Sequence, residues 1–325
     1  MPLFLIRRLF QSLAVVFAMS LIVFAGVRAI GDPVQTMIGP EATQEDIVRT
    51  RAALGLDRPL PAQYWRFVTG ALRGDLGRSY AYSTPAIDLI AERMPATLEL
   101  AFAALLIALL FGIPLGLWAG LAPDAVSGKT ITAASILGFS LPTFWVGLMM
   151  IMLFSVELGW LPTGGRGALR EWMGVKLSIF TLDGWRHLLM PALNLSLFKL
   201  ALIIRLTRAA TREALMQDYV RFARAKGLRN SRIVGVHVLK NIMIPIVTVT
   251  GLEFGSLIAF SIVTESIFAW PGMGKLIIDS INVNDQPVVI AYLLVIVLLF
   301  ISINFVVDVL YSLLDPRVRL SDSTG

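Results

Sequence analysis

The sequence predicts an all-α polytopic membrane protein with six transmembrane helices. Of its 325 residues, 56% are hydrophobic and only 15% are charged, whereas soluble domains carry roughly 25% charged residues. The apolar residues gather in segments of about 20 residues or more, the length at which a helix crosses the hydrocarbon core. Because backbone groups in lipid must be bonded within their own segment, we expect helices. The six candidate spans are residues 9–30, 97–121, 131–157, 188–206, 242–266 and 288–311.

Basic residues predict how these spans are oriented. Arg7 and Arg8 precede the first span, and eight Lys and Arg lie between Arg208 and Lys240. Positive charge is enriched in cytoplasmic loops, so we expect a cytoplasmic N-terminus and, with an even number of spans, a cytoplasmic C-terminus. The first apolar stretch is longer than the apolar part of a signal peptide, which favours an uncleaved anchor. The basic clusters adjoin apolar segments, so we expect a lipid membrane and no nucleic acid as the partner.

The polarity of the segments divides the chain into four regions. Residues 1–30 form the cytoplasmic start and the first transmembrane helix, and residues 31–96 form a polar, proline-rich extracytoplasmic loop region. Within that loop, EATQEDIVRTRAALGL has helical periodicity. Residues 97–311 form the membrane core, which contains a cytoplasmic loop at 207–241, and residues 312–325 form a cytoplasmic tail.

The sequence offers no convincing catalytic, metal or cofactor site. Gly128-Lys129-Thr130 imitates the end of a phosphate-binding loop, but Pro123 stands where that loop requires its first glycine. We interpret this stretch as a hairpin between two spans.

The histidines and Ser140 do not form a metal or catalytic site either. The only histidines, His187 and His237, form no zinc-binding pair, and Ser140 has no base near it in the sequence. Ser140 more simply bonds a backbone carbonyl that Pro142 frees, since Pro142 can bend its span, as can Pro114. We therefore expect no enzyme activity and no cofactor bound by this chain.

A repeat of glycines and one deeply placed acid suggest where the spans contact other helices or line a pathway. Gly112, Gly116 and Gly120 recur every fourth residue, which predicts a small face for helix packing, with substrate lining as the alternative. Glu253 is the acid that lies deepest in a span. Charges at such depth are costly and functional. For Glu253, lining a polar path or pairing with a partner subunit competes with a structural hydrogen bond to a neighbouring helix.

The cytoplasmic loop predicts a helix, a turn and a second helix. Gly227 can supply the left-handed residue that stops the first helix, and Asn230 or Ser231 can cap the second. Ala223 and Gly227, four residues apart, leave a small face on which a partner could seat. The alternative is a solvated basic loop that serves only to orient the protein.

Motifs along the whole chain resemble one family. QDYVRFARAKGL at 217–228, followed by HVLKN, resembles the cytoplasmic coupling loop of binding-protein-dependent ABC importer permeases. LPTFW (141–145), GWLPTGGRG (159–167) and ESIFAWPGMGKL (265–276) are similar to the dipeptide/oligopeptide (peptide/nickel) branch, in its B-type subunit. One departure is that the general importer loop has Glu-Ala-Ala where this chain has Arg221-Phe222-Ala223, a variant that fits the peptide branch.

This resemblance implies a type I ABC importer permease fold in the bacterial cytoplasmic (inner) membrane. It implies that a second, C-type permease subunit completes the pathway as a heterodimer, that two ATP-binding subunits hydrolyse ATP, and that an extracytoplasmic solute-binding protein delivers the cargo. The cargo is expected to be di- or oligopeptides, with nickel chelates, glutathione or another small solute as alternatives. An ion-coupled secondary transporter is the alternative from another class. Such transporters often contain internal repeats, and this sequence shows none. The family resemblance also implies which residues couple to the ATPase: Arg221, Phe222, Ala223, Arg224, Ala225, Lys226, Gly227 and Leu228.

Overall fold

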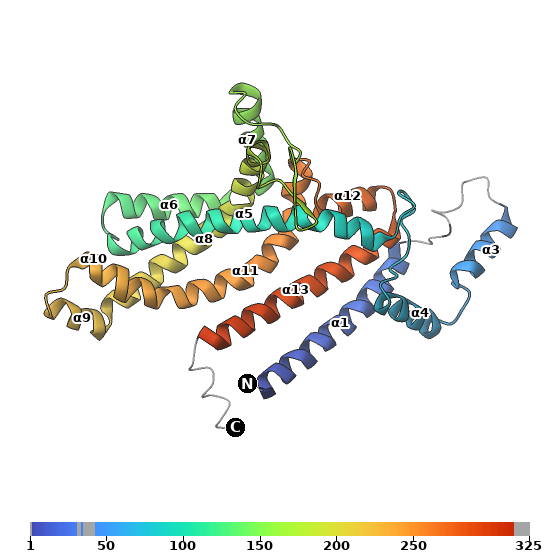
Figure 1. The fold of residues 1–325 in the computed structure, drawn as a ribbon, viewed down its shortest axis with the longest axis horizontal. Helices are drawn as coiled ribbons and strands as arrows, with labels where there is room; N and C mark the ends of the chain where they lie inside the picture. Colours follow the sequence, from blue (N-terminus) through green and yellow to red (C-terminus); the bar gives the residue numbers. More distant parts are fainter. Residues whose placement is uncertain (1, 31–33, 35–42, 315–325) are drawn as a thin grey trace. The chain divides into compact units, whose positions relative to one another are not determined.

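The computed structural model describes residues 2–30, 34 and 43–314, and most of them are helical (Figure 1). Its contacts divide the chain into two compact units, Met1–Pro95 with Gly272–Ser302 and Ala96–Pro271 with Ile303–Gly325. The all-α prediction is confirmed for the described residues, apart from one short hairpin of strands that was not predicted. Most of the expected tail, at 315–325, lies outside the described residues.

The first unit contains the first span and the helices of the outer loop region. Its elements are α1 (Pro2–Ile30), α3 (Gln44–Leu54), α4 (Leu60–Leu72), α12 (Met273–Asn282) and parts of α5 (Ala86–Leu121) and α13 (Gln286–Leu314). The helix expected from periodicity is α3. It begins at a capping box, in which the Thr43 hydroxyl accepts from the Asp46 N–H and the Asp46 carboxylate accepts from the Thr43 N–H. Gly55, in the left-handed conformation, ends it.

Asp285 joins the start of α13 to the loop before α5. It is fully buried, and its carboxylate accepts hydrogen bonds from the Ser79 hydroxyl, from the Tyr80 N–H at 3.1 Å and from the Ala81 N–H at 3.3 Å. Burial, with a smaller contribution from the Asp285 charge, raises the pKa of the Tyr80 phenol. These bonds hold the segment before α13 to the loop before α5 within the first unit.

The second unit is built around α8 (Leu182–Met216), on which α5, α6 and α11 pack (Figure 1). Its other elements are α6 (Val126–Ser140), α7 (Thr143–Met150), the π-helix η1 (Ile151–Glu157), β1 (Arg170–Trp172), β2 (Val175–Leu177), α9 (Asp218–Ala225), α10 (Asn230–Arg232), the π-helix η2 (Ile233–Val238) and α11 (Leu239–Ile267). The two strands pair antiparallel, with Arg170 opposite Leu177.

One expected span is broken. Among the described residues, five helices are long and apolar enough to cross a membrane, and the pair α6 and α7–η1 makes a sixth candidate although it bends by 101°. The break falls at Leu141, whose backbone is extended (φ −79°, ψ 133°). The residue before a proline is pushed out of the helical region, so Pro142 turns the span expected at 131–157 into two limbs.

Candidate functional site

The loop at 207–241, which we expect to be cytoplasmic, contains a short helix closed by a glycine turn. α9 ends at Ala225, and Gly227 has a φ of 75°, which confirms the predicted left-handed turn. The Gly227 N–H donates to the Arg224 carbonyl at 2.9 Å and the Leu228 N–H donates to the Ala223 carbonyl at 3.2 Å. These bonds satisfy carbonyls at the helix end that would otherwise have no partner.

The capping predicted for the next segment was wrong. α10 begins at Asn230, and Arg229 occupies the cap position without a side-chain hydrogen bond. The chain leaves the turn in an extended conformation only as far as Arg229 (φ −60°, ψ 143°), so Asn230 and Ser231 already lie inside the helix. The segment then continues as the π-helix η2 before it joins α11.

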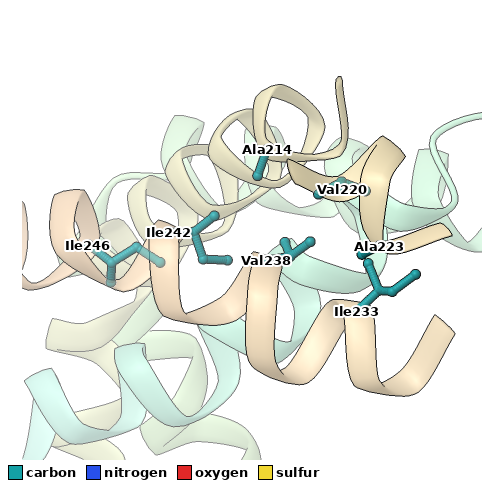
Figure 2. Close-up of a cluster of buried hydrophobic side chains, with 7 residues drawn as sticks. All are labelled: Ala214, Val220, Ala223, Ile233, Val238, Ile242 and Ile246. Atoms are coloured by element: carbon teal, nitrogen blue, oxygen red, sulfur yellow. The ribbon is translucent and has the colours of Figure 1, made fainter. Parts of the chain in front are cut away.

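The inner face of α9 is anchored in an apolar cluster, which we call the loop core. Val220 and Ala223 are 0% and 4% exposed. They pack with residues from α8, η2 and α11 (Figure 2). The members of the loop core are Ala214, Val220, Ala223, Ile233, Val238, Ile242 and Ile246. The expectation that Ala223 presents a small outward face is therefore corrected: an eight-residue helix needs an apolar anchor, and Ala223 belongs to it.

The outer face of α9 combines one aromatic ring with positive charge. Phe222 is 61% exposed, and the Lys226 Nζ lies 4.5 Å from the centre of its ring. Leu228 is half-buried against the loop core. We call the exposed set the loop-helix face: Arg221, Phe222, Arg224, Ala225, Lys226 and Gly227. Such a face suits a groove with an apolar pocket and an acidic rim.

Glu253 forms an ion pair with a lysine that the sequence reasoning did not assign to it. The Lys199 ammonium on α8 contacts the Glu253 carboxylate on α11 and donates to the Ser256 hydroxyl at 2.7 Å. That hydroxyl donates to Glu253 Oε2 at 2.8 Å. The Lys199 side chain is 7% exposed and that of Glu253 is 30% exposed. The acid thus bonds to a neighbouring helix and still presents part of its surface. The signal for this pair was a base and an acid placed well inside two successive expected spans, 188–206 and 242–266.

The glycines of α5 lie against α8. A Cβ added at Gly116 would be 2.6 Å from the Ile204 carbonyl oxygen. One added at Gly120 would be 2.7 Å from the Thr211 Cβ, and one at Gly112 would be 2.8 Å from the Ile203 Cγ2. Contacts under 3 Å leave no room for a side chain, so the close approach of α5 to α8 depends on these three positions.

A buried ion pair fastens the loop at 159–187 to α5. The Arg166 Nε and Nη2 donate to Glu99 Oε2 at 2.9 and 2.6 Å. The other oxygen of Glu99 accepts from the N–H groups of Ser178 and Ile179 at 2.7 and 2.8 Å. Glu99 stands near the end of the span expected at 97–121, a position from which a charge can reach the interface at little cost. Instead, both side chains are almost fully buried, 8% exposed for Arg166 and 1% for Glu99.

Features that imitate a metal or phosphate site are structural in the described part of the chain. No group of three or more His, Cys, Asp or Glu side chains in residues 2–30 and 43–314 is placed to hold a metal ion. Gly128 lies in the first turn of α6, after a turn at 122–125, and no strand precedes it. It is the hairpin we expected.

Comparison with known proteins agrees with this architecture. The family model described as "binding-protein-dependent transport system inner membrane component" matches residues 112–320, and its N-terminal companion matches residues 1–101. The di/tripeptide transport system permease protein DppB of Pseudomonas aeruginosa is 42% identical over 334 residues, which cover 97% of this chain and 98% of that protein. The glutathione transport system permease protein GsiC of Escherichia coli K12 is 40% identical over 321 residues, with the same coverage of both chains. Among solved structures, an inward-facing MetNI methionine ABC transporter aligns with a TM-score of 0.56 at 18% identity, covering 70% of this chain and 96% of that one.

Proposed function

Because the chain belongs to the family of binding-protein-dependent transport system inner membrane components, we propose that it imports short peptides as one half of a transport pathway. As a family member it is the permease component of an ABC importer, which works with an ATPase and a binding protein. The observation that carries the peptide proposal is the 42% identity, over nearly the full length of both chains, to a permease named for di- and tripeptides. Glutathione is the second candidate, because a relative named for it is 40% identical.

Uptake by the reconstituted transporter tests the cargo. The chain, its second permease, the ATPase subunits and the binding protein are placed in proteoliposomes and supplied with labelled dipeptides or glutathione. We expect dipeptide uptake that requires both ATP and the binding protein. Uptake of glutathione alone would favour the second candidate. Ion-driven uptake by this chain without ATP would overturn the proposal in favour of a secondary transporter.

We propose that the loop-helix face docks on the ATPase subunits, which bind and hydrolyse the ATP. Exposed Phe222 with its basic surroundings supports this, because a purely solvated loop has no need to expose an aromatic ring. A nucleotide drives a conformational change only if it binds one state better than the other. The loop core could transmit this conformational change from the ATPase to the spans, since it ties α9 to the ends of α8 and α11.

Substitutions at Gly227 test this docking with a matched control. A Cβ there would meet no atom within 4 Å, but the φ of 75° strains any other residue. Gly227→Ala adds the strain without the bulk, whereas Gly227→Trp adds both. We expect normal membrane insertion of both variants and much weaker ATPase co-purification with Gly227→Trp than with Gly227→Ala. Equal recovery of the ATPase with the two variants would contradict docking at this turn.

We propose further that the second permease is a distinct, C-type subunit and that both termini are cytoplasmic. The basic residues near Arg7 and in the cytoplasmic loop support the orientation. Glu253 is proposed to line the pathway, which its partial exposure supports.

A further inference from the structure

The helix α4 carries a wider apolar sector than its neighbour covers. At 100° per residue, Tyr64, Trp65, Phe67, Val68 and Leu72 fall with Leu60 within a sector of about 160°. The opposite side carries the polar residues Gln63, Arg66 and Thr69, and the small residue Ala62. A helix with this pattern normally buries the whole apolar sector.

One edge of that sector is taken by α1. The Tyr64 ring lies 5.2 Å from the Phe24 ring and 6.4 Å from the Phe17 ring, between ring centres. The Tyr64 hydroxyl is hydrogen-bonded to the Ser20 hydroxyl at 2.7 Å, and the Phe67 and Phe24 rings are 5.7 Å apart. α4 therefore rests on α1 through Tyr64 and Phe67, and the two helices cross (Figure 1).

This contact fixes the depth of α4 relative to the membrane. The apolar part of α1 that is suited to span the bilayer is Arg7–Gly26. At 1.5 Å per residue, Phe17 lies roughly 14 Å inside that segment from Gly26 and Phe24 roughly 3 Å inside it. A helix seated on both residues lies at the level of one leaflet, within its acyl chains and up to their boundary with the headgroups.

The other edge of the apolar sector remains uncovered. Trp65 is 68% exposed and Leu72 is 82% exposed. On α1, Phe17, whose ring lies beside that of Tyr64, is itself 59% exposed. An uncovered apolar edge at this depth, continuous with the surface of a membrane span, faces lipid.

We propose that α4 is an interfacial helix whose Trp65–Leu72 edge inserts into the phospholipid leaflet at the Gly26 end of α1. Tryptophan and tyrosine favour the boundary between headgroups and acyl chains, and Arg66 on the polar side reaches the headgroups or water. Helices of this kind lie in the plane of the interface with their apolar side in the lipid. In this chain, α4 anchors the outer loop region to the bilayer.

The absence of cysteine from the sequence makes a depth measurement direct. Trp65→Cys, Leu72→Cys and, as the matched control, Ala62→Cys on the polar side of the same helix each receive a nitroxide label. The complete transporter is placed in phosphatidylcholine–phosphatidylglycerol nanodiscs. Collision rates of the label with oxygen, which partitions into lipid, and with a polar nickel chelate give the depth parameter.

We expect a positive depth parameter at 65 and 72 and a negative one at 62. Ready access of the nickel chelate to all three labels would show that the edge faces water and would overturn the proposal. Protection of 65 and 72 from both reagents would show that another protein covers the edge and would overturn it equally. Each label position reports separately, and ATPase co-purification identifies any variant that fails to fold.

Discussion

At the scale of single residues, the carboxylate of Glu99 is bonded through both of its oxygens. Arg166 takes one oxygen and the N–H groups of Ser178 and Ile179 take the other. The sequence indicated charges near this end of the chain's second span but not their pairing, because Glu99 and Arg166 are 67 residues apart and no local pattern links them. The burial of the pair is what makes it important, since removing one member leaves the other charged and desolvated.

Arg166→Ala is therefore expected to destabilise the protein by about 3–5 kcal/mol, the usual cost of breaking a buried ion pair. Arg170→Ala is the control, because Arg170 is exposed on the β1 strand nearby and its loss should change stability little. Thermal unfolding of the purified variants in detergent measures both. Equal midpoints for the two variants would contradict the role assigned to the Glu99–Arg166 pair.

Glu253 and Lys199 pose the same question within the membrane, where a structural role and a pathway role can be separated. Glu253→Leu leaves a buried ammonium without its partner, so we expect a loss of about 3–5 kcal/mol of stability. Lys199→Met combined with Glu253→Leu removes both charges, and replacing both members of a buried pair is often neutral or stabilising. We expect the double variant to recover stability but not peptide uptake. Recovery of both would show that Glu253 is structural only.

At the scale of elements, the close packing of α5 against α8, which we call the α5–α8 seam, was the feature best predicted from the sequence. Three glycines spaced by four residues indicate a face for close approach whatever the partner helix, although the spacing alone does not identify α8 as that partner. The break between α6 and α7 was accessible only in part: Pro142 suggested a bend, whereas the angle depends on tertiary packing. The hairpin β1–β2 was missed because its strands are three residues each, too short for a period-two pattern.

Gly116→Ala is expected to cost about 1–3 kcal/mol, as overpacking of a well-packed contact does. Its Cβ would lie 2.6 Å from a backbone oxygen of α8, which cannot move alone. Gly138→Ala in α6 is the matched control, since nothing lies within 4 Å of its Cβ and alanine favours a helix. Unfolding midpoints should fall for the first variant and hold or rise for the second. A fall in both would mean that the α5–α8 seam is not the cause.

At the scale of the whole molecule, the family was identifiable from motifs spread along the chain, because motifs are recognised from the sequence without the three-dimensional structure. What the motifs did not give was the number of crossings, which depends on whether the bent pair α6 and α7–η1 traverses the bilayer. If it does, the turn before α6 and the β1–β2 hairpin lie on opposite sides of the membrane. We expect that it does.

Single cysteines in this cysteine-free chain test the crossing. Ala125 and Lys226 are exposed, and Met173 at the hairpin tip is 84% exposed. An impermeant maleimide added to intact spheroplasts should label Met173→Cys, and should label Ala125→Cys and Lys226→Cys only after permeabilisation. Protection of Met173→Cys along with Ala125→Cys in intact spheroplasts, with labelling of Lys226→Cys, would instead make the bent pair re-entrant and the number of spans odd.

The loop core has a mechanical consequence. Because Ala223 and Val220 are embedded with Ile233 and Ile242, α9 cannot tilt without carrying the bases of α8 and α11 with it. Glu253 lies 20 residues beyond Ile233 in the sequence, roughly 30 Å along a helix axis. A small rotation at the base of such a lever becomes a larger sideways displacement at the level of Glu253. If a partner docks at Phe222 as proposed, the loop helix is the short arm of a lever and α11 its long arm, and we expect a small stroke there to move groups near Glu253.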